Sequence, residues 1–393
     1  MSDSFSIVPT PLLHFGEGKI DQLTGAIKRY GTRVALVTGA NSFVLSSHFD
    51  KLTDRFGSQN LTFEHTFVRG EPTPGLVDDA VRQLASFKPD VVVSIGGGSV
   101  MDAGKAISAM ILLNESVKNY LEGIGSKTHS GVKIPFIAVP TTAGTGSEAA
   151  KNAVLSETGP HGYKRSLRHN KFVPDVAIVD PALTFSCSPF TTAASGMDAF
   201  TQLLESYLSP TGNAITDAIA LEGLKQVSSS LLPAFEDGSN RAARTGMALA
   251  AYLSGITLTN AGLGLIHGFA SSIGGFFPIP HGVICSALMA PVNKLTVRKL
   301  RSGKGSEALR KYATVGRLFS GGKSDRSDDF ETDALLNTIE TWSKTMKIPS
   351  LAELGVAASD FKRIVAITEN KNNPIHLAEE EMYEALEMAC KKV

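Results

Sequence analysis

The chain has 393 residues, of which 42% are hydrophobic and 19% charged, as in a compact globular protein large enough for two domains. Its 38 basic and 38 acidic side chains cancel, so no overall field favours nucleic acid or an anionic membrane as a partner. The three cysteines, Cys187, Cys285 and Cys390, have no CxxC spacing and indicate neither a disulfide framework nor a structural zinc site.

The N-terminal segment lacks the basic and apolar regions of a signal peptide, and the chain has no apolar run of about 18 residues. We therefore expect a cytoplasmic protein without a membrane span. Short β-branched runs then alternate with amphipathic segments, which is typical of a parallel sheet covered by helices on both faces, a doubly wound dinucleotide-binding domain. The expected strands are Arg33–Thr38, Leu61–Phe67, Val91–Ile95 and Pro135–Val139, and the expected helices are Lys19–Tyr30, Ser47–Phe56, Leu76–Phe87 and the segment after Ser99.

Three glycines follow the strand that ends at Ile95 and lead into a helix. Glycines let a ligand approach the backbone, and the helix N-terminus that follows suits a pyrophosphate. The spacing matches neither GxxxxGK[ST] nor GxGxxG, so a tight turn without a ligand remains an alternative. Asp102 and Lys105 lie one turn apart on this helix and could form a simple exposed ion pair.

The strand that ends at Val139 opens into Pro140–Glu148, PTTAGTGSE, a stretch rich in hydroxyl groups and glycine. Ligands of doubly wound sheets bind beyond the carboxyl ends of the strands, so we expect this loop to lie beside the triple-glycine loop. Taken alone, it could equally be a solvated loop that caps a helix at Glu148.

From Pro189 onward the pattern becomes helical. We therefore expect an α/β domain over residues 1–185 and an all-helical domain over residues 186–393, with a site in the cleft between them. The polar tract Ser320–Asp329 is interpreted as a surface loop between helices.

The stretch Gly262–Pro291 carries His267 and His281 in small, apolar surroundings. A helix, a Gly/Pro turn and a second helix would aim both rings at one point. Asp198 lies in a similarly apolar helical segment, where a carboxylate needs a partner, and Gln202 lies four residues later on the same face. A cation bound by these residues is one interpretation; satisfied core histidines and a helix-start aspartate are the alternatives.

With these motifs in order, the chain resembles the iron-containing (group III) alcohol dehydrogenase family over almost its whole length. The matching stretches are HFGEGKID from His14, GGGSVMDAGKA from Gly96, PTTAGTGSE from Pro140, VAIVDPALT from Val176, GMDAFTQLLESY from Gly196, GLIHGFASSIGGFFPIPHG from Gly264, and NNP at Asn372–Pro374. The resemblance implies an N-terminal nucleotide domain, a C-terminal helical domain, and hydride transfer between NAD(P) and an alcohol or carbonyl at a divalent metal, iron or zinc.

The resemblance also assigns residues to the site. Asp198, His267 and His281 match three of the family's four metal ligands and are the expected catalytic centre. The cofactor would contact the glycine loop, the helix after it and the Thr141–Ser147 loop. It would also contact Lys164 and Leu183, where the alignment with the family is less secure. These cofactor residues are Gly97, Gly98, Ser99, Asp102, Thr141, Thr142, Thr145, Ser147, Lys164 and Leu183, with Gly39 after the first long strand.

This chain departs from the family pattern at three positions. Gln202 stands where the fourth ligand is usually histidine, so we expect a three-ligand site completed by water or Gln202, or, as in maleylacetate reductases, no metal. Ser271 stands where many members have a histidine facing the substrate, and no general base is assigned. Gly39 replaces the acidic residue of NAD-selective members, which admits NADP as well as NAD.

The expected function is therefore reversible oxidation of a small alcohol to an aldehyde or ketone by a homodimeric, NAD(P)-dependent oxidoreductase that binds neither nucleic acid nor membrane. A sugar-phosphate cyclase of the dehydroquinate synthase type is the alternative enzyme class, and an inactive binding descendant is the alternative outside catalysis.

Overall fold

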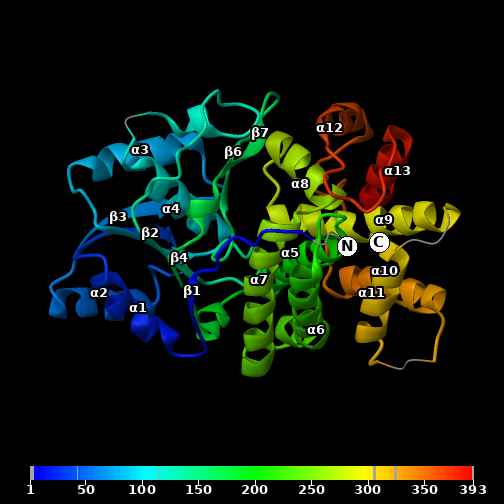
Figure 1. Ribbon diagram of the computed structural model, residues 1–393, viewed down its shortest axis with the longest axis horizontal. Coiled ribbons are helices and arrows are strands. Elements are labelled where there is room, and N and C mark those ends of the chain that lie inside the picture. Colours follow the sequence, from blue (N-terminus) through cyan, green and yellow to red (C-terminus); the bar gives the residue numbers. More distant parts are fainter. Residues whose placement is uncertain (1–3, 42, 114, 304–306, 323–324, 392–393) are drawn as a thin grey trace. The chain divides into compact units, whose positions relative to one another are not determined.

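The computed structural model describes residues 4–41, 43–113, 115–303, 307–322 and 325–391. They form two compact units (Figure 1). One consists of Val8–Glu157 with Lys164–Ser186; the other consists of Cys187–Val393 with Thr158–Tyr163 and the N-terminal residues up to Ile7. The first unit is α/β and the second is helical, which confirms the predicted fold class.

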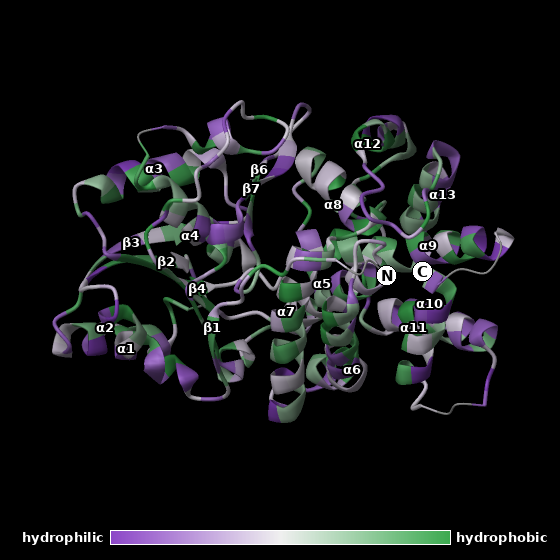
Figure 2. Cartoon of the chain, in the orientation of Figure 1, coloured by the Kyte–Doolittle hydropathy of each residue, from purple (hydrophilic) through white to green (hydrophobic). Residues whose placement is uncertain are grey.

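A six-stranded parallel sheet forms the centre of the α/β unit, in the order β1-β8-β5-β4-β2-β3. The central strands are built from Val, Ile and Ala, and all residues of β4 and β5 are buried. Figure 2 shows these strands in the hydrophobic colour. The strands are β1 (Leu12–Phe15), β2 (Arg33–Gly39), β3 (Thr62–Val68), β4 (Val91–Gly96), β5 (Phe136–Pro140) and β8 (Val176–Val179).

Helices cover both faces of this sheet (Figure 1). Buried side chains of α1 and α2 pack with those of the strands in one hydrophobic core, while α3 and α4 lie on the other face. Pro74 begins α3, and the Thr73 hydroxyl caps it by accepting a hydrogen bond from the Leu76 N–H at 3.1 Å. The helices are α1 (Leu23–Lys28), α2 (Ser47–Ser58), α3 (Pro74–Ala85) and α4 (Gly98–Met110).

Several elements of this unit differ from the sequence-based expectation. The short strand β1 pairs with β8, far along the chain, and strands β6 (Asn152–Glu157) and β7 (Tyr163–Arg168) form a separate two-stranded sheet. The helix considered at Glu148 does not form: Ser147–Ala149 is a turn that leads into β6. Four short 3-10 helices complete the connections, at Lys19–Gln22, Val117–Tyr120, Asn170–Phe172 and Pro181–Thr184.

The second unit is helical, as predicted. Its central helix is α5, whose residues from Thr192 onward are almost all buried, and it packs against α6, α7 and α9. The helices are α5 (Pro189–Leu208), α6 (Ala214–Glu236), α7 (Arg241–Ala261), α8 (Leu265–Phe276), α9 (His281–Ser302), α10 (Glu307–Phe319), α11 (Asp328–Thr345), α12 (Phe361–Ile367) and α13 (Glu379–Cys390), with a 3-10 turn at Ala358–Asp360.

Two sequence-based expectations concern the surface of this unit. The polar tract Ser320–Asp329 connects α10 to α11, although its residues 323–324 lie outside the described residues and α11 already begins at Asp328. Among the described residues, no single helix is long and apolar enough to cross a membrane; α7 and α8 reach that length only as a pair bent by 98°.

Candidate metal and cofactor sites

Three helices bring the predicted metal ligands together. Asp198 lies in the middle of α5, His267 in the first turn of α8, and His281 is the first residue of α9. The approach of α9 to α5 depends on Gly282, because a Cβ there would lie 2.4 Å from the carbonyl oxygen of Ala194. A glycine at this position therefore lets the His281 ring reach the Asp198 carboxylate.

The side chains converge on one point. The Oδ1 atom of Asp198 lies 3.4 Å from Nε2 of His267 and 3.8 Å from Nε2 of His281. Cys285, one turn after His281 on α9, places its Sγ 3.8 Å and 3.7 Å from the same two nitrogens. Asp198, His267 and Cys285 are buried, whereas the His281 side chain is 23% exposed, so the cluster reaches the surface at that ring.

Glu205 fixes the orientation of His267. Its Oε2 lies 2.6 Å from Nδ1 of His267, and its Oε1 accepts the backbone N–H of Ile266 at 2.7 Å. In the neutral ring that binds a cation, a carboxylate on Nδ1 would hold the hydrogen on that nitrogen and leave the Nε2 lone pair for the ion. This is the usual arrangement of an imidazole that binds a metal ion.

The electrostatics of the cluster favour a cation. Asp198 is 1% exposed and its Oδ1 has no hydrogen-bond partner among the described residues, although a buried carboxylate oxygen normally has one. Burial alone would lower the pKa of His267, but Cys285, Glu205 and Asp198 raise that pKa well above its usual value. The same negative surroundings would stabilise a divalent ion, and the carboxylate, imidazole and thiol donors fit one.

Gln202 and Ser271 occupy the positions where this chain departs from the family pattern. The Oε1 atom of Gln202 accepts a hydrogen bond from Ser254 at 2.7 Å, and the Gln202 side chain also hydrogen-bonds to Asp198. The oxygen of this amide thus has a protein donor of its own. Ser271 donates its hydroxyl to the carbonyl oxygen of His267 at 2.8 Å, and Lys371 donates to that same carbonyl at 3.0 Å.

In the α/β unit, the two predicted cofactor loops lie side by side. Gly96 at the end of β4 is paired with Pro140 at the end of β5, and the Thr141 N–H donates to the Gly96 carbonyl oxygen at 2.8 Å. A Cβ on Gly98 would lie 2.4 Å from the Thr145 side chain, and one on Gly97 would touch Thr142. No side chain caps α4 at Gly97, so its first N–H groups, including that of Ser99, remain suited to a phosphate.

Asp102, Lys105 and Ser147 form a hydrogen-bonded network at these loops, and Lys105 and Ser147 are buried. The Nζ of Lys105 donates to the carbonyl oxygen and the hydroxyl of Ser147 and to the carbonyl oxygen of Asn152, at 2.8–2.9 Å. Ser147 donates its hydroxyl to Asp102 at 2.6 Å. Lys105 is 0% exposed, so the exposed ion pair considered from the sequence is wrong. Burial lowers the pKa of Lys105 to about 8.

The remaining predicted cofactor residues, Lys164, Leu183 and Gly39, also belong to the α/β unit. Lys164 is buried and pairs with Glu71 at 2.9 Å. Leu183 is 7% exposed and packs in the hydrophobic core beside the sheet. Gly39 ends β2, and a Cβ added there would meet only Val100, at 3.8 Å, so a larger side chain has room.

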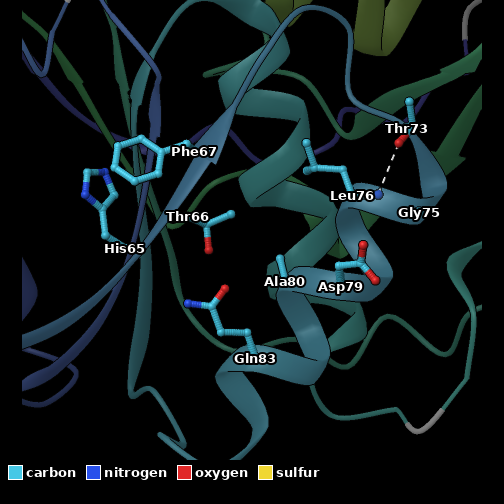
Figure 3. Close-up of a pocket in the computed structure, with 9 residues that line it drawn as sticks. All are labelled: His65, Thr66, Phe67, Thr73, Gly75, Leu76, Asp79, Ala80 and Gln83. Carbon is cyan, nitrogen blue, oxygen red and sulfur yellow. Dashed lines mark hydrogen bonds between the residues drawn. The ribbon is translucent and has the colours of Figure 1, made fainter.

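An open hollow of about 570 Å³ lies between β3 and α3 (Figure 3). His65 and Phe67 line one side, and Thr73, Asp79 and Gln83 line the other. None of the predicted cofactor or metal residues lines it, so this hollow is separate from both candidate sites.

The sequence reasoning missed Cys285 and Glu205. Both had a detectable signal, because Cys285 lies four residues after His281 and Glu205 seven residues after Asp198, which are same-face spacings in a helix. The charge of Glu205 in an apolar helix was the stronger signal.

Comparison with known proteins gives matches over both units. Residues 10–181 match the family model described as iron-containing alcohol dehydrogenase, and residues 192–390 match the C-terminal model of the Fe-containing alcohol dehydrogenase family. The chain is 32% identical over 358 residues to alcohol dehydrogenase 4 of Saccharomyces cerevisiae (strain YJM789), covering 90% of this chain and 88% of the relative.

Two further proteins are similar. Long-chain-alcohol dehydrogenase 1 of Geobacillus thermodenitrificans is 37% identical over 278 residues, which is 70% of this chain and 69% of that one. The crystal structure of a 1,3-propanediol oxidoreductase superposes with a TM-score of 0.88 at 28% identity, over 98% of this chain and 100% of that one.

Proposed function

The chain belongs to the iron-containing alcohol dehydrogenase family, and from that premise we propose which residues carry its NAD(P)-linked alcohol dehydrogenase activity. The reaction is hydride transfer between a nicotinamide cofactor and a small alcohol, aldehyde or ketone. In this proposal Asp198, His267 and His281 hold a divalent metal ion. The observation that carries the proposal is the buried Oδ1 of Asp198, which faces two imidazole nitrogens and has no hydrogen-bond partner among the described residues.

When bound, the metal ion polarises the substrate oxygen and the nicotinamide ring gives or accepts the hydride. The residues of this chain supply binding and orientation. Glu205 keeps the Nε2 lone pair of His267 directed at the metal position. The partly exposed edge of His281 gives the substrate oxygen access to the cluster, while the buried surroundings of Asp198 exclude water from it.

The cofactor is assigned to the α/β unit. Gly97, Gly98 and Ser99 offer backbone N–H groups to the pyrophosphate at the start of α4. Thr141, Thr142 and Thr145 supply hydroxyl groups from the neighbouring loop, and Asp102 and Ser147 hold that loop in place. Lys164, Leu183 and Gly39 are proposed to contact the ribose and adenine portions. The loop that begins at Gly39 carries no carboxylate through Ser47, so both NADH and NADPH are proposed to bind.

The substrate is proposed to be a short or medium-chain primary alcohol and its aldehyde, by analogy with the relatives named above. We also propose that the protein acts in the cytoplasm as a homodimer, which light scattering on the purified full chain would test.

Replacement of His281 by Ala tests the assignment. It removes one metal ligand at the exposed edge of the cluster, so we expect bound metal and NAD(P)H-dependent aldehyde reduction to be lost. Cofactor affinity, measured by quenching of protein fluorescence, should remain within about twofold, because the proposed cofactor residues belong to the other unit. The metal assignment would be contradicted if the wild-type protein kept its activity after chelation and the His281→Ala variant were as active as the wild type. His376→Ala, in the loop before α13, is the matched control.

A further inference from the structure

The cluster around Asp198 contains a fourth donor besides the three residues assigned above. Cys285 is buried one turn after His281, and its sulfur is directed between the two imidazole rings. One atom from each of Asp198, His267, His281 and Cys285 lies within 4.8 Å of the other three. Four donors from three helices therefore surround one small volume.

The nitrogen–sulfur and nitrogen–oxygen distances among these donors are close to those of a tetrahedral metal site. With ordinary zinc bond lengths and tetrahedral angles, the nitrogen–sulfur edges are about 3.6 Å and the nitrogen–oxygen edges about 3.4 Å. The observed sulfur-to-nitrogen distances are 3.8 Å and 3.7 Å. The observed oxygen-to-nitrogen distances are 3.4 Å and 3.8 Å. These four edges differ from the tetrahedral values by at most about 0.4 Å, and all four donor atoms lie within 4.8 Å of one another.

Hydrogen bonds alone do not account for this arrangement. Glu205 engages Nδ1 of His267, so Nε2 is the ring nitrogen that faces both the Cys285 sulfur and the Asp198 carboxylate. A thiol has one hydrogen and can donate to only one of the two imidazole nitrogens it faces. The Oδ1 of Asp198 has no donor among the described residues. A divalent cation would satisfy all four groups at once.

Gln202 is the competing fourth ligand, and its contacts favour a different role. Its Oε1 accepts a hydrogen bond from the Ser254 hydroxyl at 2.7 Å, and its side chain hydrogen-bonds to Asp198. An amide engaged in this way orients the carboxylate. The sulfur of Cys285 faces the two nitrogens directly.

We propose that Cys285 binds the metal ion as a thiolate, so that the site has one carboxylate, two imidazole and one sulfur ligand and favours zinc over iron. The proposal rests on the metal site assigned above and adds its fourth ligand and metal preference. On binding, the thiol releases its proton to solvent and a sulfur lone pair forms the bond to the metal, without any change of oxidation state. Thiolate ligands are soft donors and favour zinc, whereas harder donor sets do not discriminate in this way.

With Cys285 as a ligand, the protein would offer four donors to the ion, and the substrate oxygen would have to join or replace one of them. Because Cys285 is buried and His281 is partly exposed, the open side of the site is the His281 side.

Cobalt(II) substitution tests this ligand directly, without reference to activity. The apoprotein prepared by chelation is titrated with cobalt(II), and sulfur-to-cobalt charge transfer is read as an intense near-ultraviolet band. The variant Cys187→Ser/Cys390→Ser keeps Cys285 as its single cysteine, so any such band in it comes from Cys285. We expect the band in the wild type and in this double variant, and its loss in Cys285→Ser.

Metal content and affinity give a second readout. We expect the protein purified from cells supplied with both metals to contain more zinc than iron. Cys285→Ser should weaken zinc binding at least about 100-fold, because the loss of a direct ligand should exceed the 10–100-fold cost of losing a residue that only orients a ligand. Cobalt bound without the charge-transfer band would overturn the role of Cys285 and leave the Asp198, His267 and His281 site intact. Failure of the wild type to bind either metal would overturn both proposals. The double variant decides the question even if Cys285→Ser does not fold.

Discussion

At the scale of single residues, Glu205 determines the orientation of His267, one of the proposed metal ligands. Both of its carboxylate oxygens are used, one by the Ile266 N–H and the other by Nδ1 of His267. Gly264 makes this possible, because a Cβ there would lie 2.8 Å from Oε1 of Glu205. Glu205 therefore connects the start of α8 to the orientation of a metal-binding ring.

Replacement of Glu205 by Gln should weaken metal binding about 10–100-fold. An amide has only one oxygen, so its NH2 group must face either the Ile266 N–H or the His267 N–H, and one of these contacts is lost. Titration of the apoprotein with zinc against a competing chelator measures the effect. Glu340→Gln, at an ion pair on α11, is the control. Unchanged zinc affinity in Glu205→Gln would show that this carboxylate does not orient the ligand.

A second prediction at the scale of one residue concerns cofactor choice at Gly39. A carboxylate at this position would bind ribose hydroxyls and repel a 2′-phosphate. Gly39→Asp should therefore lower the ratio of kcat/KM for NADPH to that for NADH at least about tenfold, which corresponds to about 1.4 kcal/mol. Gly39→Asn, of equal size and no charge, is the control. A ratio that falls equally in both variants would indicate steric interference and not charge selection.

At the scale of elements, three of the four predicted strands are apolar on both faces; the fourth, β3, has several exposed residues, and the apolar, fully buried β8 was not predicted. Segments such as VVVSI need a sheet covered on both sides, and they appear as β2, β4 and β5. β1 was missed because it is only four residues, LLHF, and is defined by pairing with β8 more than 160 residues later. β6 and β7 were missed because their polar, half-exposed residues resemble a loop.

The same limit applies to the candidate sites. The triple-glycine loop and the two histidines could be found from sequence because their local composition is unusual. The contact between Gly98 and Thr145 depends on the pairing of β4 with β5, and the position of Cys285 depends on the angle between α8 and α9. Such packing angles have no local signature in the sequence.

Lys105 links three elements of the α/β unit, and its replacement is predicted to loosen the cofactor loop. It connects α4 to Ser147 and to the start of β6 by three hydrogen bonds. Lys105→Met fills similar volume but leaves those oxygens without their donor, which costs about 1–3 kcal/mol of unfolding free energy. The NADPH dissociation constant should rise at least about tenfold.

The Lys105→Met variant also separates the cofactor loop from the metal site. Urea unfolding and fluorescence titration measure stability and cofactor affinity, and Lys51→Met on the exposed face of α2 is the control. Zinc content should stay at the wild-type level, because the metal residues lie in the helical unit. A loss of stability without any loss of cofactor affinity would limit Lys105 to a structural role.

For the whole molecule, the two ligands should stabilise different units. The proposed metal ligands all lie in Cys187–Val393, and the proposed cofactor residues all lie in Val8–Glu157 and Lys164–Ser186. A ligand that binds only the folded form stabilises it by about 2.7 kcal/mol at 100 times its dissociation constant. NADPH at that concentration should raise the thermal transition of the α/β unit by about 5–10 °C, given the usual entropy of unfolding for a domain of this size.

Chelation should lower the transition of the helical unit instead, because Asp198 and the three groups around it would lose their common partner. Scanning calorimetry of the full chain, with and without chelator and with and without NADPH, distinguishes the two effects. His281→Ala should show no response to chelator and keep its response to NADPH. If chelation and NADPH instead shift one single transition by additive amounts, the two units unfold together. Loss of the metal would then destabilise the whole chain, and the prediction of independent stability would be wrong.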